Sequence, residues 1–373
     1  MGNVDSRSKY EHGYMMVQTT QPIFNPGQTV SGSIYMRVGP MGCPSKDVLL
    51  EVKGVEKVSW FDRVSRQVNG RTEYENVKRK GKKEILHYKQ PCFTFSVPTL
   101  MPGDYTIPFQ FQLPQGIPSS IMFQGTGQKR PKAKVKYCIK AILQDHSNKA
   151  MMKYKQVLIV REQGDTYQTD IKQAQTNNVK TWCCMDQGPS TVEVEFAKNV
   201  FEPTDVCKAT VNVNNSQCNL NINHVRLAIE QELRLTTSPG GGFLSHSNNE
   251  TFVLQSRDFP GVTARTAEKE PRPLEVDLKT IKYVVAASRK KKGVDKPLSV
   301  EDRYMLENIA ANCKGRLITN QYFLTVRCDF AGCTCCSQTP VCRVPITIVP
   351  IINPQVWGYQ QPQDFNPQVY QAC

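Results

Sequence analysis

The sequence predicts an all-β protein made of two β-sandwich domains in tandem. Three observations predict this fold class. Apolar and polar residues alternate with a period of two over many short stretches, as in strands with one buried face. Proline and glycine, 24 and 23 in number, separate these stretches and are typical of turns. The two halves of the 373-residue chain also share a pattern, and each half is long enough for its own core.

The clearest alternating stretch spans residues 132–141. This pattern predicts a half-buried strand with a cationic outer stripe. Lysines occupy one face at Lys132, Lys134, Lys136 and Lys140, and apolar residues occupy the other at Ala133, Val135, Tyr137, Ile139 and Ala141. Further strands are expected at residues 48–58, 93–97, 107–113, 191–196, 209–213, 224–229, 321–327 and 343–349.

A shift of 177 residues superimposes apolar positions of the two halves without a gap. Phe24 falls on Phe201, and farther along Val52 falls on Ile229. Any two strands share a period of two, so some coincidence is expected by chance. The offset is unchanged over about 30 residues, which favours a duplicated domain.

The repeat and the local composition divide the chain into five parts. The polar stretch after the first domain, rich in Gln, Asn and Thr, predicts a linker. The Gln- and Pro-rich tail is expected to be disordered. A short helix is expected within 298–315 as an insertion in the second domain, because Ser299 can cap it and Gly315 can end it. The expected segments are 1–13, 14–163, 164–189, 190–350 and 351–373.

The net charge of +14 lies almost entirely in the first half of the chain. Residues 1–163 carry 25 Lys and Arg against 12 Asp and Glu. This asymmetry predicts an anionic partner for the first half: acidic lipid, phosphorylated protein or nucleic acid. Aromatic residues do not interleave with the lysines, and no nucleic-acid-binding signature is present, which disfavours nucleic acid.

The sequence carries no catalytic or cofactor motif. Its five histidines fit no zinc-protease pattern, and no Gly-rich phosphate loop or nucleophile elbow occurs. We therefore expect no enzyme and no cofactor. The start lacks the apolar core of a secretory signal, and no apolar stretch reaches about 18 residues. The cytoplasm is expected, where disulfides are rare, so the 14 cysteines are interpreted as buried or free thiols.

Five cysteines lie within 15 residues near the end of the second domain. Thiolates at this density can bind zinc, but the spacing is not that of two Cys-x2-Cys knuckles. The competing interpretation is that they are incidental thiols or acylation targets at a hairpin tip. They are Cys328, Cys333, Cys335, Cys336 and Cys342.

The first six residues, Met-Gly-Asn-Val-Asp-Ser, fit the myristoylation pattern and predict an acyl chain on Gly2. One myristoyl chain anchors only weakly, so a second attraction is needed. Basic runs can supply it at an anionic membrane, and the alternative for each run is a solvated loop. The runs are Lys78, Arg79, Lys80, Lys82 and Lys83, expected in a hairpin loop, and Arg289, Lys290, Lys291 and Lys292 in the insertion.

The tail repeats the sequence Asn-Pro-Gln-Val followed by an aromatic residue. One copy runs from Asn353 to Trp357 and the other from Asn366 to Tyr370. Two copies predict a short docking peptide that is used twice. Compositional bias of a Gln- and Pro-rich tail is the alternative.

Several stretches resemble the arrestin family, and the α-arrestins in particular. Residues 103–114, Gly-Asp-Tyr-Thr-Ile-Pro-Phe-Gln-Phe-Gln-Leu-Pro, are similar to the Gly-x-Tyr/His-x-Phe-Pro-Phe-x-Phe-x-Leu-Pro signature of α-arrestins. Residues 24–32 and 52–60 resemble earlier strands of the first arrestin domain. Residues 322–326 and 344–348 resemble the closing strands of the second. The sequence departs from the family in lacking a Pro-Pro-x-Tyr motif and a clathrin box.

The resemblance implies two immunoglobulin-like β-sandwiches of the arrestin type. It also implies an adaptor or scaffold that binds cytoplasmic tails of membrane proteins for sorting, endocytosis or signalling. Such a protein would be cytoplasmic, peripherally attached to the plasma membrane or endosomes, and linked to trafficking or ubiquitination machinery. The lysine stripe would receive acidic or phosphorylated cargo, because four like charges on one face repel until a counter-charge arrives. The alternatives are a structural subunit of a sorting coat, like retromer's arrestin-fold component, and a basic nucleic-acid-binding protein.

Overall fold

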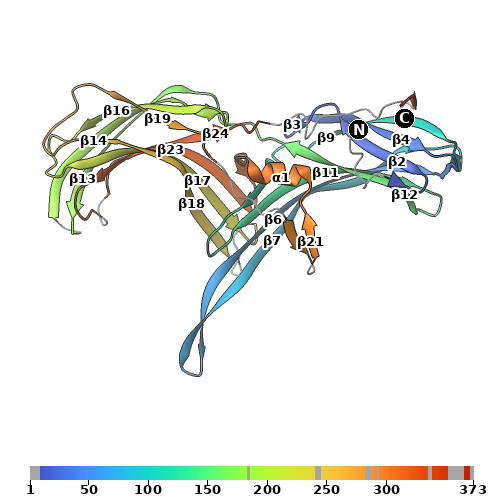
Figure 1. Cartoon of the computed structure of the whole chain (residues 1–373), viewed down its shortest axis with the longest axis horizontal. Coiled ribbons are helices and arrows are strands. Elements are labelled where there is room, and N and C mark those ends of the chain that lie inside the picture. The colour runs from blue at the N-terminus through green and yellow to red at the C-terminus, as the bar shows by residue number, and fades with distance from the viewer. Residues whose placement is uncertain are drawn as a thin grey trace.

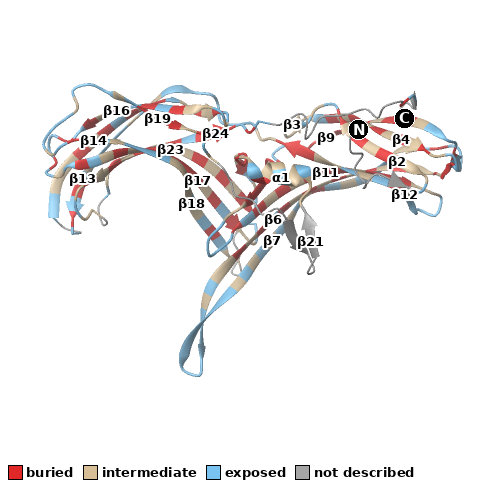
Figure 2. Cartoon of the chain, viewed as in Figure 1, coloured by how far each residue is buried: buried red, intermediate tan, exposed pale blue. Residues whose placement is uncertain are grey.

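The structure, a computed structural model, describes residues 9–182, 185–239, 245–281, 288–291, 294–334, 338–351 and 365–369. Two β-sandwiches lie side by side, and a long hairpin projects from near their junction (Figure 1). The prediction of an all-β chain with two sandwiches and one short helix is confirmed. Alternating residues turn inward along most strands, so that buried positions line the inner faces of both sandwiches (Figure 2).

The first sandwich packs a five-stranded sheet on a six-stranded sheet. Its strands are β1 (Lys9–Tyr10), β2 (Gly13–Thr19), β3 (Ile23–Phe24), β4 (Thr29–Val38), β6 (Asp47–Val68), β7 (Arg71–Thr94), β9 (Gly103–Gln112), β10 (Ile121–Gln124), β11 (Lys132–Gln144), β12 (Ala150–Val160) and β25 (Pro367–Val369). The sheet orders are β1-β2-β4-β9-β25 and β3-β12-β11-β6-β7, with β10 paired to β11. Strands β5 (Cys43–Pro44) and β8 (Thr99–Leu100) form a separate pair.

The second sandwich has a four-stranded and a six-stranded sheet. Its strands are β13 (Thr169–Thr181), β14 (Met185–Lys198), β15 (Val200–Phe201), β16 (Val206–Asn214), β17 (Ile222–Thr236), β18 (Ser247–Pro260), β19 (Arg272–Asp277), β22 (Cys313–Lys314), β23 (Ile318–Phe330) and β24 (Val341–Ile348). The orders are β13-β14-β16-β19 and β15-β24-β23-β17-β18, with β22 paired to β23. A small hairpin, β20 (Ser288–Lys291) and β21 (Val294–Pro297), precedes the helix α1 (Val300–Glu307).

The two larger sheets repeat the same strand order, as the 177-residue offset predicts. Phe24 and Phe201 are both 1% exposed, and both lie in two-residue strands that pair in parallel with the closing strand of their sheet. In the first sheet Phe24 pairs with Val160, and in the second Phe201 pairs with Ile348. A parallel pair of this kind at equivalent places in both halves supports the duplication.

The projecting hairpin is the free part of β6 and β7. Strand β6 pairs with β11 only as far as Ser59, and beyond that point it pairs with β7 alone. Asn69 and Gly70 form the turn with φ values of 50° and 74°, which matches a two-residue turn with both central residues left-handed. The expected strands at 48–58 and 93–97 are therefore the inner ends of a much longer hairpin.

Two expected segments differ from the structure. Residues 169–181 lie inside the expected linker 164–189 but form β13, an edge strand of which only Val179 and Thr181 are buried. Its polar composition reflects this exposure. In the expected disordered tail, residues 367–369 form β25 beside β9, and residues 352–364 lie outside the described residues. The helix begins at Val300 with Ser299 as its cap, as expected, and ends already at Glu307.

The two sandwiches share an apolar interface. Leu233, Leu235, Leu317 and Ile318 of the second domain belong to the same buried cluster as the core of the first. The relative position of the two sandwiches is therefore held by core-like packing.

Candidate functional site

Strand β11 presents its lysines on one face, as the alternation predicts. Ala133, Val135, Tyr137, Ile139 and Ala141 are at most 3% exposed and face the core. Gly54 of the neighbouring strand β6 lies opposite Tyr137, and a Cβ at this position would come within 2.5 Å of the tyrosine ring. The absence of a side chain at Gly54 thus lets Tyr137 pack inward and keeps the lysine face regular.

The lysine stripe lies in a larger groove that crosses β11, β6 and β7. The groove consists of two adjoining hollows of about 650 and 560 Å³ that share several lining residues. We call it the lysine groove. It is lined by ten lysines: Lys53, Lys57, Lys78, Lys80, Lys82, Lys132, Lys134, Lys136, Lys140 and Lys155.

The basic run at residues 78–83 supplies part of this groove. The sequence predicts a hairpin loop for this run, and this prediction is wrong. The run lies in the middle of β7, because the turn comes earlier at Asn69–Gly70. Strand alternation splits the run between two faces. Lys78, Lys80 and Lys82 line the groove. Arg79 points to the other face, where its Nε lies 3.1 Å from Asp62, and Lys83 shares that parity.

Three groove lysines were not predicted from the sequence. They are Lys53 and Lys57 on β6 and Lys155 on β12. A signal for two of them was present, since Lys53 and Lys57 share one parity in the expected strand 48–58. Only the register that places β6 beside β11, with Lys57 opposite Lys134, shows that the separate basic stretches form one surface.

Acidic residues neutralise part of the groove. Lys140 Nζ lies 3.2 Å from Glu51, and Lys53 lies 2.8 Å from Glu84. Burial alone would raise the pKa of Glu51, but hydrogen bonds from Lys140 and His87 outweigh it and lower the pKa. In the parts of the chain that the structure describes, no carboxylate lies within ion-pair distance of Lys57, Lys80 or Lys155. The groove therefore keeps a large cationic excess.

The helix α1 of the second domain forms one wall of the groove. Its Asp302 lies in one hollow and its Leu306 in the other. Asp302 accepts hydrogen bonds from Lys136 at 2.5 Å and from Lys134 at 3.4 Å. The counter-charge for Lys134 and Lys136 therefore comes from a residue more than 160 positions away in the sequence.

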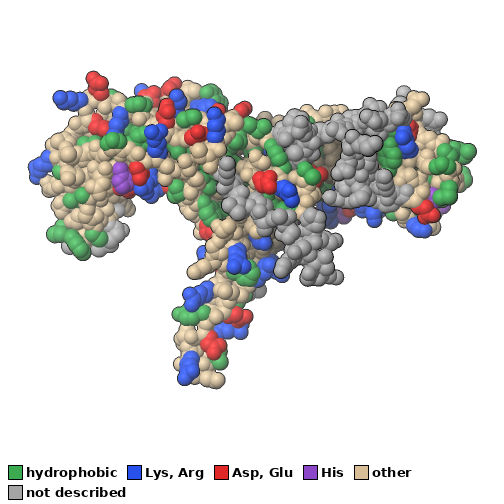
Figure 3. Space-filling view, in the orientation of Figure 1, with side chains coloured by type: hydrophobic (Ala, Val, Ile, Leu, Met, Phe, Trp, Pro, Cys, Tyr) green, Lys and Arg blue, Asp and Glu red, His purple; other side chains and the backbone are tan. Residues whose placement is uncertain are grey.

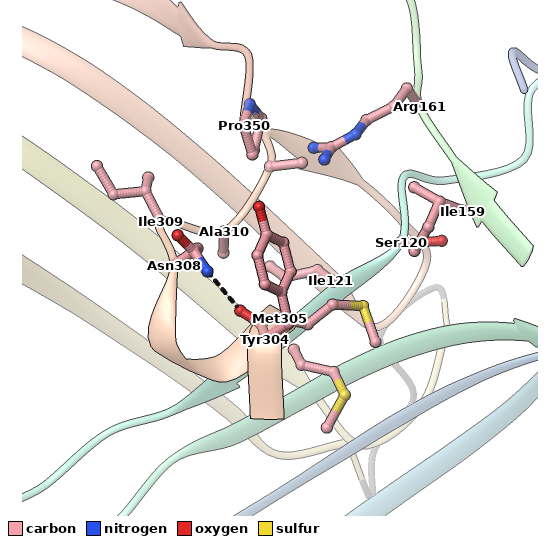
Figure 4. A pocket seen from close by; sticks show the side chains of 12 residues that line it. Ser120, Ile121, Ile159, Arg161, Tyr304, Met305, Asn308, Ile309, Ala310 and Pro350 are labelled. Atoms are coloured by element: carbon pink, nitrogen blue, oxygen red, sulfur yellow. Dashed lines mark hydrogen bonds between the residues drawn. The ribbon is translucent and has the colours of Figure 1, made fainter. Parts of the chain in front are cut away.

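The side of α1 facing away from the groove closes the junction between the domains. Arg161, which directly follows β12, and Tyr304 of α1 extend from two sides into a hollow of about 30 Å³ (Figure 4). Asn308 Nδ2 donates to the Tyr304 carbonyl at 2.8 Å, and burial lowers the pKa of Arg161 to about 10. This volume holds about one water molecule, so the seam is a packed joint.

Both halves of the chain match models of known domains. Residues 15–166 match the arrestin (or S-antigen) N-terminal domain, and residues 186–353 match the arrestin C-terminal domain. The chain belongs to the arrestin family. It is similar to arrestin domain-containing protein A of Dictyostelium discoideum, with 27% identity over 222 residues, which cover 57% of this chain and 36% of that protein. This arrestin thus matches little more than a third of that relative's length.

Membership in the family confirms the resemblance of the sequence to arrestins. Arrestins are generally adaptors without catalytic activity, and this membership supports an arrestin-like adaptor. Among the described residues of this arrestin, no helix has the length and apolar character needed to cross a bilayer.

The cysteine cluster is only partly described. Cys328 and Cys342 lie in β23 and β24 with their thiols in the core, and burial raises the pKa of Cys328 to about 12 and that of Cys342 to about 11. Thiols held protonated in this way are poor metal ligands. Cys333 lies at the hairpin tip, and Cys335 and Cys336 lie outside the described residues. Within the described chain no group of His, Cys, Asp or Glu is arranged to hold a metal.

The remaining candidate residues are described in part or not at all. Arg289, Lys290 and Lys291 lie in β20, where only the backbone is described, and Lys292 lies outside the described residues. Gly2, Asn353, Trp357 and Tyr370 also lie outside them. Asn366 directly precedes β25, and its backbone N–H donates to Asp104 at 2.9 Å.

Proposed function

We propose that this arrestin is an adaptor whose lysine groove holds acidic or phosphorylated cytoplasmic tails of membrane proteins. The observation that carries the proposal is the gathering of ten lysines around one groove, whose lining among the described residues includes two acids, Glu51 and Asp302. Phosphate and carboxylate groups form charge-assisted hydrogen bonds with such lysines.

The shape of the groove favours an extended peptide over a membrane surface. The side chains of Lys136 and Lys134 are only 16% and 26% exposed, because α1 stands beside them. A flat bilayer would meet the rim of the groove and not these inner lysines. An extended chain that follows the groove would contact several of its lysines in succession.

The expected affinity is the sum of several weak contacts. An exposed ion pair is worth about 0–1 kcal/mol, so one phosphate alone would bind weakly. A segment with several acidic groups would bind more tightly, and its affinity would fall steeply with salt.

The test measures binding of a fluorescent peptide rich in phosphoserine and glutamate by fluorescence anisotropy. Lys57→Glu/Lys80→Glu alters two exposed groove lysines and should weaken binding about tenfold or more. Lys269→Glu/Lys279→Glu makes the same change in net charge at exposed sites of the second domain and should bind like the wild type. Equal loss in both variants, or preference for poly(U) RNA over the peptide, would contradict a cargo groove.

We also propose that the adaptor acts at an anionic membrane, attached through an acyl chain on Gly2. The projecting hairpin carries Lys and Arg side chains along its length, which supports this part of the proposal (Figure 3). Gly2→Ala should move the protein from the membrane to the soluble fraction of cells. An intact mass of the native protein without an acyl group would rule out this attachment. Fixed stoichiometric partners on co-purification would instead favour a coat subunit.

A further inference from the structure

The tail of the chain is held at one edge of the first sandwich. Strand β9 pairs with β4 on one side and with β25 on the other, where the pairing covers residues 104–106. This second pairing is parallel, with Gln368 opposite Tyr105 and Val369 opposite Thr106. The edge of a sheet offers its backbone N–H and C=O groups to an added strand, whichever chain that strand belongs to. The edge of β9 is therefore a site for an extended peptide.

A largely buried carboxylate fixes the register of the bound tail. The side chain of Asp104 is 10% exposed and accepts two hydrogen bonds from Arg37, at 2.6 and 2.7 Å. Its Oδ2 also accepts the backbone N–H of Asn366 at 2.9 Å. The bond from Arg37 is the main cause that lowers the pKa of Asp104, and the Asn366 N–H lowers it further. Pro367 biases the residue before it toward an extended conformation, which suits addition to a strand.

An apolar side chain makes the second contact of the tail. Phe365 is 9% exposed, and its ring packs edge-on against Tyr35 and lies 5.8 Å from the Arg37 guanidinium. The bound segment thus begins with an apolar residue, continues with an N–H that binds Asp104, and ends with three residues that join the sheet.

The same pattern occurs a second time in the tail. Residues 365–370 are Phe-Asn-Pro-Gln-Val-Tyr, and residues 352–357 are Ile-Asn-Pro-Gln-Val-Trp. The first and last positions are apolar or aromatic in both copies, and the four positions between them are identical. The first copy has an apolar residue, Ile352, where the second has Phe365, and a backbone N–H before proline at Asn353. It therefore carries the groups that the second copy uses at β9.

The first copy cannot reach the edge of β9 in its own molecule. The carbonyl of Ile351, directly before this copy, accepts the Tyr304 hydroxyl of α1 at 2.6 Å. One further residue advances the chain by at most about 3.8 Å. Figure 1 shows β25 beside the C-terminal mark, in the outer part of the first sandwich and away from α1. The second copy reaches this place because residues 352–364 precede it and can span about 45 Å.

We propose that the edge of β9 is a docking site for this six-residue motif, and that the copy at residues 352–357 occupies it in a second molecule. In this exchange each of two molecules places its first copy on the β9 of the other, in place of the second copy. Asn353 then donates its N–H to Asp104 of the other molecule. Both sites stay filled, and the arrangement closes as a two-fold dimer.

The second copy controls the exchange because it belongs to the same chain as its site. Its effective concentration at the edge of β9 is on the order of millimolar. A first copy from another molecule competes poorly with it at micromolar protein concentration, so the intact chain should be mainly monomeric. Weakening the second copy should shift the equilibrium toward the dimer.

The test uses the full chain with the second copy weakened. Phe365→Ala/Asn366→Pro, which we call the tail-release variant, removes the ring contact and the N–H that binds Asp104. In analytical ultracentrifugation at high micromolar concentration, this variant should sediment as a dimer and the wild type as a monomer. Adding Asn353→Pro removes the matching N–H of the first copy and should restore the monomer. Asn366→Ala keeps the N–H and is the matched control, which should remain monomeric.

A fluorescent peptide of residues 351–358 probes the site without dimerisation. The tail-release variant that also carries Asn353→Pro should bind this peptide at least about tenfold more tightly than the wild type, whose second copy occupies the edge. The same peptide with Asn353→Pro should bind weakly to both proteins. Neither Phe365 nor Asn366 belongs to the buried cluster of the first sandwich, so the variants should remain folded.

Three outcomes would overturn the proposal. The first is a tail-release variant that stays monomeric and does not bind the peptide. The second is equal binding of the peptide to the wild type and to the tail-release variant, because the peptide would then bind elsewhere. The third is a dimer that persists after Asn353→Pro is added, because the open edges of β9 would then pair directly and not through the first copy.

Discussion

The carboxylate of Glu56 in β6 accepts the backbone N–H of Leu317, 261 positions later in the chain, at a distance of 2.9 Å. The backbone N–H groups of Arg316 and Ile318 donate to the same carboxylate at 3.3 and 2.9 Å. Glu56 is 1% exposed, so one buried side chain of the first domain satisfies the turn between β22 and β23 of the second. This carboxylate joins the two sandwiches next to the lysine groove.

Replacement of Glu56 by alanine should weaken the joint between the domains. Three N–H groups would lose their acceptor, two of them in the buried residues Leu317 and Ile318, and the cost should be about 1–3 kcal/mol of unfolding free energy. Chemical denaturation monitored by tryptophan fluorescence measures it. Glu73→Ala, an exposed change on the projecting hairpin, is the control and should be nearly neutral. A Glu56→Ala variant as stable as this control would show that the joint depends on apolar packing alone.

The same carboxylate should make stability depend on pH. Burial is the largest influence and raises the pKa of Glu56, and the three backbone donors only partly oppose it. A group whose pKa is higher in the folded state stabilises that state when protonated. Its contribution should therefore be complete below the ordinary carboxyl pKa and be lost as the pH rises through the raised value. As the pH rises from about 4 to 8, the melting temperature of the wild type should fall relative to that of Glu56→Gln. If the difference between the two melting temperatures stays constant over this range, the assignment to Glu56 is refuted.

Gly54→Ala should destabilise the first domain through a steric clash. The new Cβ would lie 2.5 Å from the Tyr137 ring, which is held in place by its hydroxyl donating to the Pro118 carbonyl at 2.7 Å. Overpacking of this kind costs about 1–3 kcal/mol. Gly39→Ala is a matched control, because its Cβ would meet its nearest atom, the His12 carbonyl oxygen, only at 3.7 Å. Thermal unfolding of the two variants measures the difference in stability. Equal melting temperatures would show that the Tyr137 side chain can move to accommodate the new methyl group.

Phe365→Ala should release β25 from the edge of β9. The Phe365 ring packs edge-on against Tyr35 with centroids 5.6 Å apart, and the Arg37 guanidinium lies 5.8 Å from its centroid. An aromatic pair contributes about 0.5–1.5 kcal/mol beyond area burial, so global stability should change little. Hydrogen exchange at the β9 edge should rise in the variant. If the protection at residues 104–106 is unchanged, the backbone pairing alone holds the tail.

Local sequence patterns predicted the sandwich architecture well because each strand carries its own alternation. The equivalence of Phe24 and Phe201, for example, was visible from their offset alone. Patterns failed where an edge is involved: β13 has one open side and so keeps a polar composition, and β25 is a three-residue strand that pairs with the edge of β9. In both cases pairing with a neighbouring strand, which leaves no local apolar pattern, places the segment in the sheet.

The candidate site was predicted only in fragments. The periodicity of residues 132–141 predicted the lysine stripe on β11. That this stripe forms one surface with Lys78, Lys80 and Lys82 of β7 depends on the register of β6, which lies between the two strands. The role of Asp302 was beyond any local pattern, because a carboxylate in a helix gives no sign of lysines in a distant strand. Long-range ion pairs of this kind are set by the tertiary fold.

The pairing of β25 with β9 has a consequence for how the chain is made. Asn366 is synthesised 262 residues after Asp104, to which it donates. On the ribosome, β25 therefore cannot cover the edge of β9 until the whole second sandwich has been synthesised. Open edges are where nascent strands pair with wrong partners. Chains that stall before residue 365 would expose this edge and should be the ones that chaperones retain.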